Sequence, residues 1–340
     1  MSEPSSIADL WEGSVATHSQ NRCLIHAGDD LFPERTLSFA QVDSAANQVA
    51  HWALAQGLRK GDTVALFMEN RPEFVVTWLG LAKVGIITAW LNNTIMGQPL
   101  VHSVSISSAK LLVFGVELQD VVAHVHSDLV RAGIESVVMS GTAPFCRTLD
   151  GSLAVQPPTS PGTHQRSGIK TTDTMCYIYT SGTTGLPKAA VISHRKYMGT
   201  GAMGKALLKP ADVLYGSGMP LYHSAAGMIG IGCMIASGCS FLIRRKFSAS
   251  AWRSDLNEYG VTSCQYIGEL ARYILALPER PDDKDNKLRL CVGNGLRPEY
   301  WKDFQVSLFN TLSLCLPSTN IERLPDALRG GRCLRVLRFH

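Results

Sequence analysis

The chain has 340 residues, of which 45% are hydrophobic and 18% charged, an ordinary globular balance that excludes a disordered or collagen-like chain. Its formal net charge is +4. Five of its arginines follow position 305, so the body of the chain is near neutral and charge gives no case for nucleic-acid binding. The nine cysteines include no CxxC pair, and we expect reduced thiols in a cytosol-facing protein rather than disulfides or zinc ligands.

Apolar runs alternate with amphipathic segments through the first half of the chain, which predicts an α/β fold. The expected helices lie at 40–55, 71–85 and 99–107, and the expected strands at 63–68, 86–90 and 111–114. Residues 155–168 are rich in Pro, Ser and Gly, which predicts an exposed linker between two halves.

The second half continues the same pattern, with expected strands at 176–179, 213–215, 261–266 and 288–292 and an amphipathic helix at 268–277. Residues 225–243 carry no charge and reach the lower limit of a membrane-spanning length. Because several glycines interrupt this run, we expect a buried helix followed by a strand.

The most specific feature is the segment 177–188, an apolar strand that runs into a loop with two glycines, four hydroxyls and one lysine. Glycines let backbone amides face an anion, and hydroxyls donate hydrogen bonds to phosphate oxygens. The spacing of a Walker A loop is absent, so a different kind of phosphate site is predicted. Its residues are Thr180, Ser181, Gly182, Thr183, Thr184, Gly185 and Lys188.

This loop resembles the phosphate-binding signature of adenylate-forming (AMP-binding) enzymes. The stretches 177–195, 247–250, 265–270 and 293–297 are together similar to the fatty acid transport protein / very-long-chain acyl-CoA synthetase family, over about residues 5–305. The resemblance implies an incomplete N-terminal domain of α/β fold, with two sheets and interleaved helices. It also implies ATP-dependent ligation of a long- or very-long-chain fatty acid to coenzyme A during fatty acid uptake, with Mg²⁺ assisting ATP.

The resemblance assigns roles to particular residues. Lys188 and Thr183 would be catalytic, and the loop with Lys188 would hold the ATP phosphates. The adenine would be bordered by Gly293, Asn294 and Gly295. The segment 219–224 resembles the motif at the mouth of the acyl pocket, so the substrate pocket would comprise Tyr222, His223, Tyr266, Gly268 and Glu269. No metal ligand is predicted, because the family's magnesium carboxylate lies in a Tyr-Gly-x-Thr-Glu motif that this sequence lacks.

The family pattern is expected to end at position 305. Residues 306–340 are expected to be an aberrant tail from an unspliced intron or a shifted frame, with a divergent isoform as the alternative. Residues 1–340 alone are then expected to form little or no acyl-CoA. Family members are usually attached to membranes, so we expect a cytosol-facing position on the endoplasmic reticulum, peroxisome, lipid droplet or plasma membrane.

Two other functions stay open. One is an adenylating ligase for another carboxylic acid, such as a medium-chain or aromatic one. The other is a non-catalytic remnant that binds lipid or nucleotide and acts through a membrane or a partner. The implied small-molecule partners of the main hypothesis are a long-chain fatty acid, ATP and coenzyme A, and no nucleic acid is expected.

Overall fold

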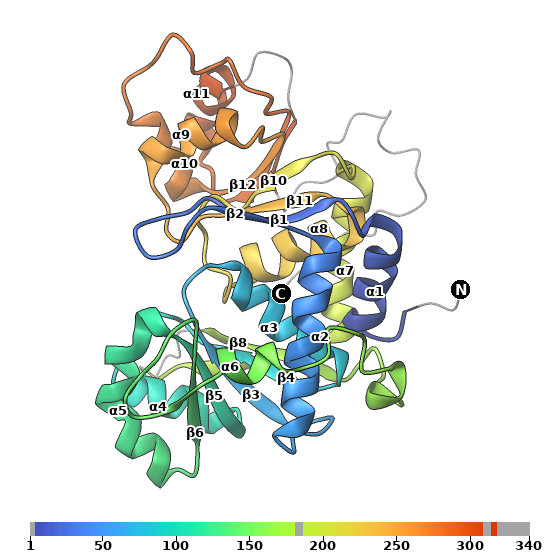
Figure 1. Cartoon of the computed structure of the whole chain (residues 1–340). Helices are drawn as coiled ribbons and strands as arrows, with labels where there is room; N and C mark the ends of the chain where they lie inside the picture. The colour runs from blue at the N-terminus through green and yellow to red at the C-terminus, as the bar shows by residue number, and fades with distance from the viewer. Residues whose placement is uncertain (1–3, 181–185, 309–313, 318–340) are drawn as a thin grey trace.

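Two seven-stranded sheets organise the residues that the computed structural model describes, 4–180, 186–308 and 314–317. Helices lie between the sheets and on their outer faces (Figure 1). This arrangement confirms the expected α/β fold with two sheets and interleaved helices.

The lower sheet of Figure 1 has the order β7-β6-β5-β3-β4-β8-β9 and is parallel except for the β8–β9 pair. Alternate side chains of its strands enter two different cores, as the period of a β-strand requires. Helices α4 (Gln98–Ile106) and α5 (Gln119–Arg131) cover the outer face. The strands are β3 (Thr63–Phe67), β4 (Ile87–Trp90), β5 (Ala109–Gly115), β6 (Glu135–Met139), β7 (Arg147–Thr148), β8 (Thr174–Thr180) and β9 (Lys188–Ser193).

The upper sheet has the order β14-β13-β12-β10-β11-β1-β2 and is parallel except for the β1–β2 pair. Helices α9 (Ala249–Glu258), α10 (Gly268–Leu275) and α11 (Pro298–Leu308) belong to its outer side (Figure 1). Its strands are β1 (Arg22–His26), β2 (Arg35–Ser38), β10 (Val213–Tyr215), β11 (Ser240–Ile243), β12 (Ser263–Ile267), β13 (Leu290–Asn294) and β14 (Leu314–Pro317).

The largest core lies between the sheets and is filled by five helices. Ser38 caps α2 through a capping box with Gln41, and Pro72 opens α3, so both helices begin where the sequence signals place them. The five helices are α1 (Ile7–His18), α2 (Phe39–Ala55), α3 (Pro72–Lys83), α7 (His194–Leu207) and α8 (Ile231–Ser237).

The uncharged run 225–243 folds as predicted into helical turns and a strand. A π-helical turn, η3 (Ser224–Gly230), leads into α8, and β11 follows. Among the described residues, no helix combines the length and apolar character needed to cross a bilayer.

Within residues 306–340, a strand occurs that the sequence did not predict. β14 pairs in parallel with β13 at the end of the upper sheet. Helix α11 also continues through positions 305 and 306 without a break. The Arg-rich part of this segment, 318–340, lies outside the described residues.

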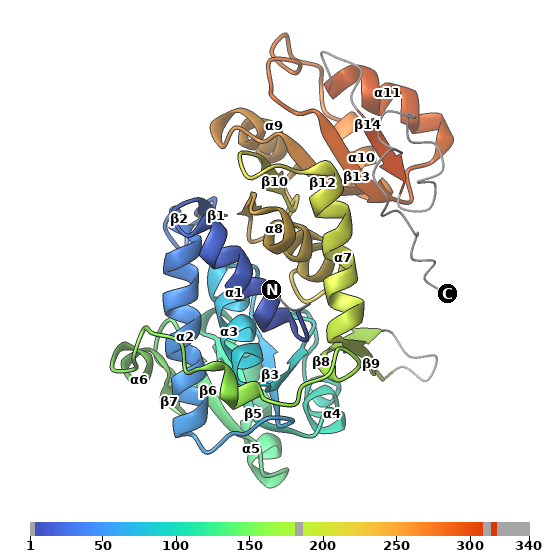
Figure 2. The ribbon, with the colours of Figure 1, turned by 90° about the vertical axis from the view of Figure 1, so that its right-hand side faces the viewer.

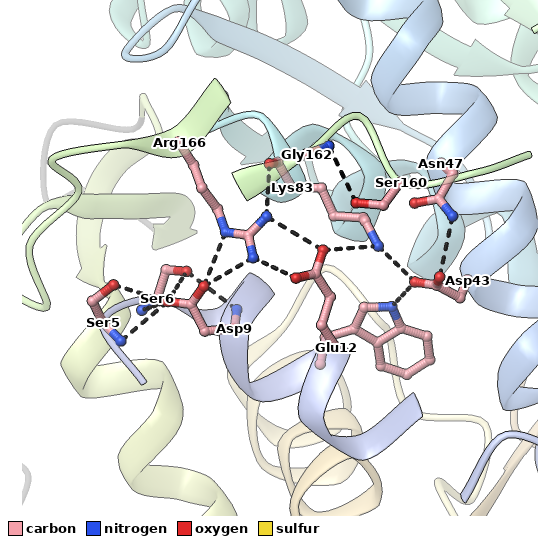
Figure 3. A network of polar contacts seen from close by, with 11 residues as sticks. Ser5, Ser6, Asp9, Glu12, Asp43, Asn47, Lys83, Ser160, Gly162 and Arg166 are labelled. Carbon is pink, nitrogen blue, oxygen red and sulfur yellow. Dashed lines mark hydrogen bonds and ion pairs between the residues drawn. The ribbon is translucent and has the colours of Figure 1, made fainter. Parts of the chain in front are cut away.

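The stretch 155–168 is largely exposed, as expected of a linker, but its end is fastened to the inter-sheet helices. Arg166 is buried and forms ion pairs with Asp9 at 2.9 Å and Glu12 at 2.5 Å in α1 (Figure 3). Composition alone does not reveal these contacts, because the carboxylates lie more than 150 positions away in the chain.

Lys83 extends this set of ion pairs to α2. Its side chain is fully buried, and its ammonium lies 3.2 Å from Glu12 and 2.7 Å from Asp43 (Figure 3). Trp11 donates its indole N–H to Asp43 at 2.7 Å. We call the following set the polar network: Asp9, Glu12, Asp43, Lys83 and Arg166.

Candidate active site

The predicted phosphate loop begins where β8 ends. β8 and β9 pair antiparallel, with Thr180 opposite Lys188, and both side chains are exposed. Because β8 is parallel to β4, Thr180 lies at the carboxyl edge of the lower sheet, where open α/β sheets bind ligands. The rest of the loop lies outside the described residues: Ser181, Gly182, Thr183, Thr184 and Gly185.

Tyr179 fixes the base of this hairpin. Its hydroxyl donates a hydrogen bond to the backbone oxygen of Ser103 in α4 at 2.6 Å. Burial raises the pKa of Tyr179 to about 12, so the hydroxyl remains a neutral donor at physiological pH. The neighbouring Thr180 and Lys188 are therefore presented from a well-anchored ladder.

The predicted acyl-pocket motif follows β10. Tyr222 is half-buried against the core between the sheets, and burial raises its pKa. His223 is exposed and directly precedes the π-helical turn η3, a kind of turn that is frequent at functional sites. Gln265 of β12 donates from Nε2 to the backbone oxygen of Ala225 at 2.9 Å, which ties the start of η3 to the upper sheet.

A cleft of about 620 Å³ opens at the carboxyl ends of β12 and β13. We call it the strand-end cleft. A crevice at this edge of a parallel sheet is the usual ligand site of such folds. Four residues predicted for the site line it together, with four others: Gly268, Glu269, Asn294 and Gly295, then Ile267, Arg272, Arg297 and Tyr300.

Glycines bring the two strand ends into contact. A Cβ on Gly268 would lie 1.9 Å from the backbone oxygen of Gly295. A Cβ on Gly293 would lie 2.0 Å from the backbone oxygen of Tyr266. Side chains are excluded at these points, and Gly268 and Gly295 contribute only backbone to the wall of the cleft.

Charge in the strand-end cleft is exposed. Glu269 and Arg272 form an ion pair three residues apart on α10, with side chains 54% and 48% exposed. The hydrogen bond from Arg272 lowers the pKa of Glu269, so this carboxylate stays ionised at neutral pH. Arg297 is 76% exposed and lies 3.8 Å from Glu299. The cleft thus presents two cationic groups to solvent, each beside a carboxylate partner.

Not all predicted pocket residues reach this cleft. Tyr266 is 2% exposed, and its ring packs against Phe304 of α11 with centroids 5.6 Å apart. Sequence reasoning in turn misses Arg272 and Arg297 as cleft residues. The available signals are the Glu269–Arg272 spacing directly after a strand and the position of Arg297 beside a Gly-rich segment.

The two groups of candidate residues lie in different sheets, and α7 connects them. Figure 2 shows α7 running from the β8–β9 pair to the upper sheet. Its last turns pack Met203 and Leu207 against Leu290 and Val292 of β13. Helix α7, which starts directly after β9, therefore packs against β13, the strand whose end borders the strand-end cleft.

A magnesium ion does not fit the described part of the cleft. Its one lining carboxylate, Glu269, is already paired with Arg272. Among the described residues, no group of three or more His, Cys, Asp or Glu side chains is arranged to hold a metal ion. Mg²⁺ is therefore given no role in the chemistry of these residues.

The family pattern described as "AMP-binding enzyme" matches residues 11–315 of this sequence. The chain belongs to the AMP-binding enzyme family. The match runs past position 305, the expected end of the family pattern, into β14.

Two curated relatives are similar in sequence to this AMP-binding enzyme chain. It is 44% identical over 283 residues to long-chain fatty acid transport protein 2 of Rattus norvegicus, covering 81% of this chain and 45% of the relative. It is 32% identical over 311 residues to medium/long-chain-fatty-acid–CoA ligase FadD6 of Mycobacterium tuberculosis, covering 89% and 50%. The chain spans about half the length of these relatives.

Solved structures share the fold. The anthranilate CoA ligase AuaEII in complex with anthranoyl-AMP superposes with a TM-score of 0.80 at 20% identity, covering 93% of this chain and 60% of that chain. At this level of identity the likeness concerns the fold, and it confirms the two-sheet architecture expected from the sequence.

Proposed function

We propose that the protein containing this chain is an ATP-dependent long- or very-long-chain fatty acid–CoA ligase that acts in fatty acid uptake. A carboxylate oxygen of the acid attacks the α-phosphorus of ATP, and the bond to the bridging oxygen breaks to release pyrophosphate. The sulfur of coenzyme A then attacks the acyl carbonyl carbon and the thiol proton is lost to solvent; the bond from this carbon to the oxygen shared with AMP breaks, and AMP leaves with that oxygen. The similarity to fatty acid transport proteins and to a fatty-acid–CoA ligase supports this substrate class.

One observation carries the proposal. A hairpin that bears a phosphate-loop signature and a cleft walled by bare backbone and arginines lie at the carboxyl ends of strands within one AMP-binding domain. Lys188 and Thr183 would neutralise and bond the phosphates, with the rest of the loop, Thr180 to Gly185, cradling them. Gly293, Asn294 and Gly295 would border the adenine.

The acyl end of the substrate belongs to the same proposal. Tyr222 and His223 would lie at the junction of the adenylate and the acyl chain, with Gly268 and Glu269 across the cleft. Tyr266 would shape the pocket from behind, because its side chain is buried in the core against Phe304.

Attachment to a membrane is also part of the proposal. The relatives named as transport proteins support a place at a membrane surface, and we place the protein on its cytosol-facing side as part of the proposal. A long-chain acid partitions into bilayers, so an enzyme at the surface meets its substrate there.

The test is pyrophosphate exchange into ATP by the full-length protein, measured with a series of acids. Exchange that depends on long-chain fatty acids supports the proposal. Exchange only with medium-chain or aromatic acids would favour a ligase for another acid. Nucleotide or lipid binding without any exchange would favour the non-catalytic remnant.

A further inference from the structure

Asn70 connects the end of β3 in the lower sheet to loops that follow two strands of the upper sheet. It follows β3 of the lower sheet and precedes α3, so it stands at the carboxyl end of a central strand. Asn70 is buried, with 4% of its surface exposed. A buried amide of this kind requires several hydrogen-bond partners.

Among the described residues, the hydrogen-bond partners of the Asn70 side chain lie in loops that follow strands of the upper sheet. Nδ2 donates to the backbone oxygens of Met219 at 2.9 Å and Arg244 at 3.2 Å, with a longer contact to Gly218 at 3.4 Å. Oδ1 accepts the backbone N–H of Leu221 at 2.7 Å. One amide thus joins the segments that follow β10 and β11.

The segment after β10 needs such support because its backbone is irregular. Ser217 and Gly218 both have positive φ, at 52° and 67°. Its other side-chain anchor is the hydroxyl of Ser217, which donates to the backbone oxygen of Gln265 at 2.6 Å and accepts from Trp252 at 3.0 Å. Asn70 holds the opposite side of the same turn.

We infer that Asn70 is a positioning residue for the adenylation reaction, acting through Tyr222 and His223. The inference rests on the proposed function. Leu221, whose N–H Asn70 accepts, directly precedes these two residues. Asn70 fixes the start of the motif from the lower sheet, while Gln265 fixes the turn after it from β12. The motif is thereby held in register with the sheet that carries Lys188.

The chemistry at this position calls for an amide. Aspartate has the same shape, but it would place an acceptor oxygen and a negative charge against the carbonyl oxygens of Met219 and Arg244. The turn would shift or gain mobility, and a shift of about 1 Å in a substrate-positioning group costs about 100-fold in rate.

The experiment compares Asn70→Asp with Asn47→Asp in the full-length protein, by pyrophosphate exchange dependent on a long-chain fatty acid. Asn47 serves as a control because it is 3% exposed and its Nδ2 donates to the backbone oxygen of Pro158 at 2.8 Å and to Oδ2 of Asp43 at 3.1 Å, contacts that do not involve the motif at 219–224. We expect Asn70→Asp to lower kcat/KM for the acid about 100-fold. The KM for ATP should change less than about threefold, since the lower-sheet hairpin is untouched. Asn47→Asp should lose at least as much stability, because its carboxylate would face that of Asp43, but it should keep its kcat/KM.

A second arm tests the route of the effect. In a cycle with His223→Ala, the double variant should be no slower than about the slower single variant, because both changes disable the same motif. Additive losses, or equal kinetics of the two aspartate variants, would overturn the inference and leave the proposed function standing. Absence of exchange in the wild-type protein would overturn both.

Folding failure has its own control. If Asn70→Asp does not fold, Asn70→Ser keeps a small donor and acceptor at the site without the charge. A folded Asn70→Ser protein with reduced kcat/KM for the acid supports the inference, and one with full activity overturns it. Failure of both variants to fold would overturn it as well, because Asn70 would then serve folding alone.

Discussion

The polar network of Figure 3 and the strand-end cleft are both built around arginine and glutamate, yet they differ in exposure. In the polar network, Arg166 is 4% and Lys83 0% exposed, and each cation has two carboxylate partners. In the cleft, Arg272 and Arg297 are 48% and 76% exposed. Paired charge that is buried fastens helices together, whereas the paired charge at the strand ends stays exposed to solvent, where a ligand can reach it.

The largest expected effect comes from disrupting the polar network. Lys83→Met keeps the apolar stem but leaves Asp43 without its cation and Glu12 with Arg166 alone. Removing one partner of a buried ion pair should lower the free energy of unfolding by about 3 kcal/mol. Urea-induced unfolding of the purified protein measures this.

The control is Arg147→Met, which removes an exposed ion pair with Glu135 on the edge of the lower sheet. Exposed pairs contribute about 1 kcal/mol or less. Equal, small losses in the two variants would mean that burial does not distinguish the polar network from surface pairs.

The second prediction concerns the exposed lysine of the β8–β9 hairpin. Lys188 is exposed and packs little, so Lys188→Ala should leave the unfolding free energy nearly unchanged. Loss of its charge-assisted contact to phosphate should raise the activation free energy of adenylation by about 2–4 kcal/mol. Pyrophosphate exchange measures the rate, and Lys205→Ala, which removes an exposed lysine on α7, is the matched control. A normal exchange rate in folded Lys188→Ala protein would refute the assignment.

The third prediction tests whether bare backbone shapes the cleft. Gly268→Ala places a Cβ 1.9 Å from the backbone oxygen of Gly295, so the two strand ends must separate. Overpacking of this kind should cost about 1–3 kcal/mol of stability and weaken nucleotide binding. Gly13→Ala is the control, because no atom lies within 4 Å of its added Cβ and alanine favours the helix. ATP binding that is unchanged in Gly268→Ala would exclude the backbone wall as part of the nucleotide site.

The comparison also shows what a sequence can predict. The apolar runs at 63–68 and 176–179 form strands and the helix expected at 40–55 forms as α2, because each depends on neighbours within a few residues. The phosphate signature likewise occupies one continuous segment, between β8 and β9, and its role stays a prediction.

The remaining features depend on distant contacts. The fastening of Arg166 to α1 and the bridge from Asn70 to Leu221 join positions about 150 apart, and no local pattern predicts them. Tyr266 was expected in the pocket, yet alternation along β12 turns its side chain into the core while the next residues reach the cleft.

The smallest expected effect is a pH dependence of the free energy of unfolding that is caused by a buried histidine at the start of α7. His194 is 3% exposed, and its Nδ1 accepts the backbone N–H of Ile7 at 3.2 Å, which requires the neutral ring. Burial lowers the pKa of His194 from 6.5 to about 4. The unfolded chain therefore takes up a proton on this ring at a higher pH than the folded protein does, and stability falls as the pH falls from 6.5 toward 4.

Between pH 7 and pH 5.5 this ring should lower the unfolding free energy by about 1 kcal/mol. Burial also lowers the pKa of His26, so it contributes in the same direction, and the difference between wild type and His194→Gln isolates His194. Urea-induced unfolding at the two pH values should show a weaker pH dependence in the glutamine variant, whose amide can still accept the N–H of Ile7. An identical pH dependence in the two proteins would mean that protonation of the His194 ring is not coupled to the docking of α1.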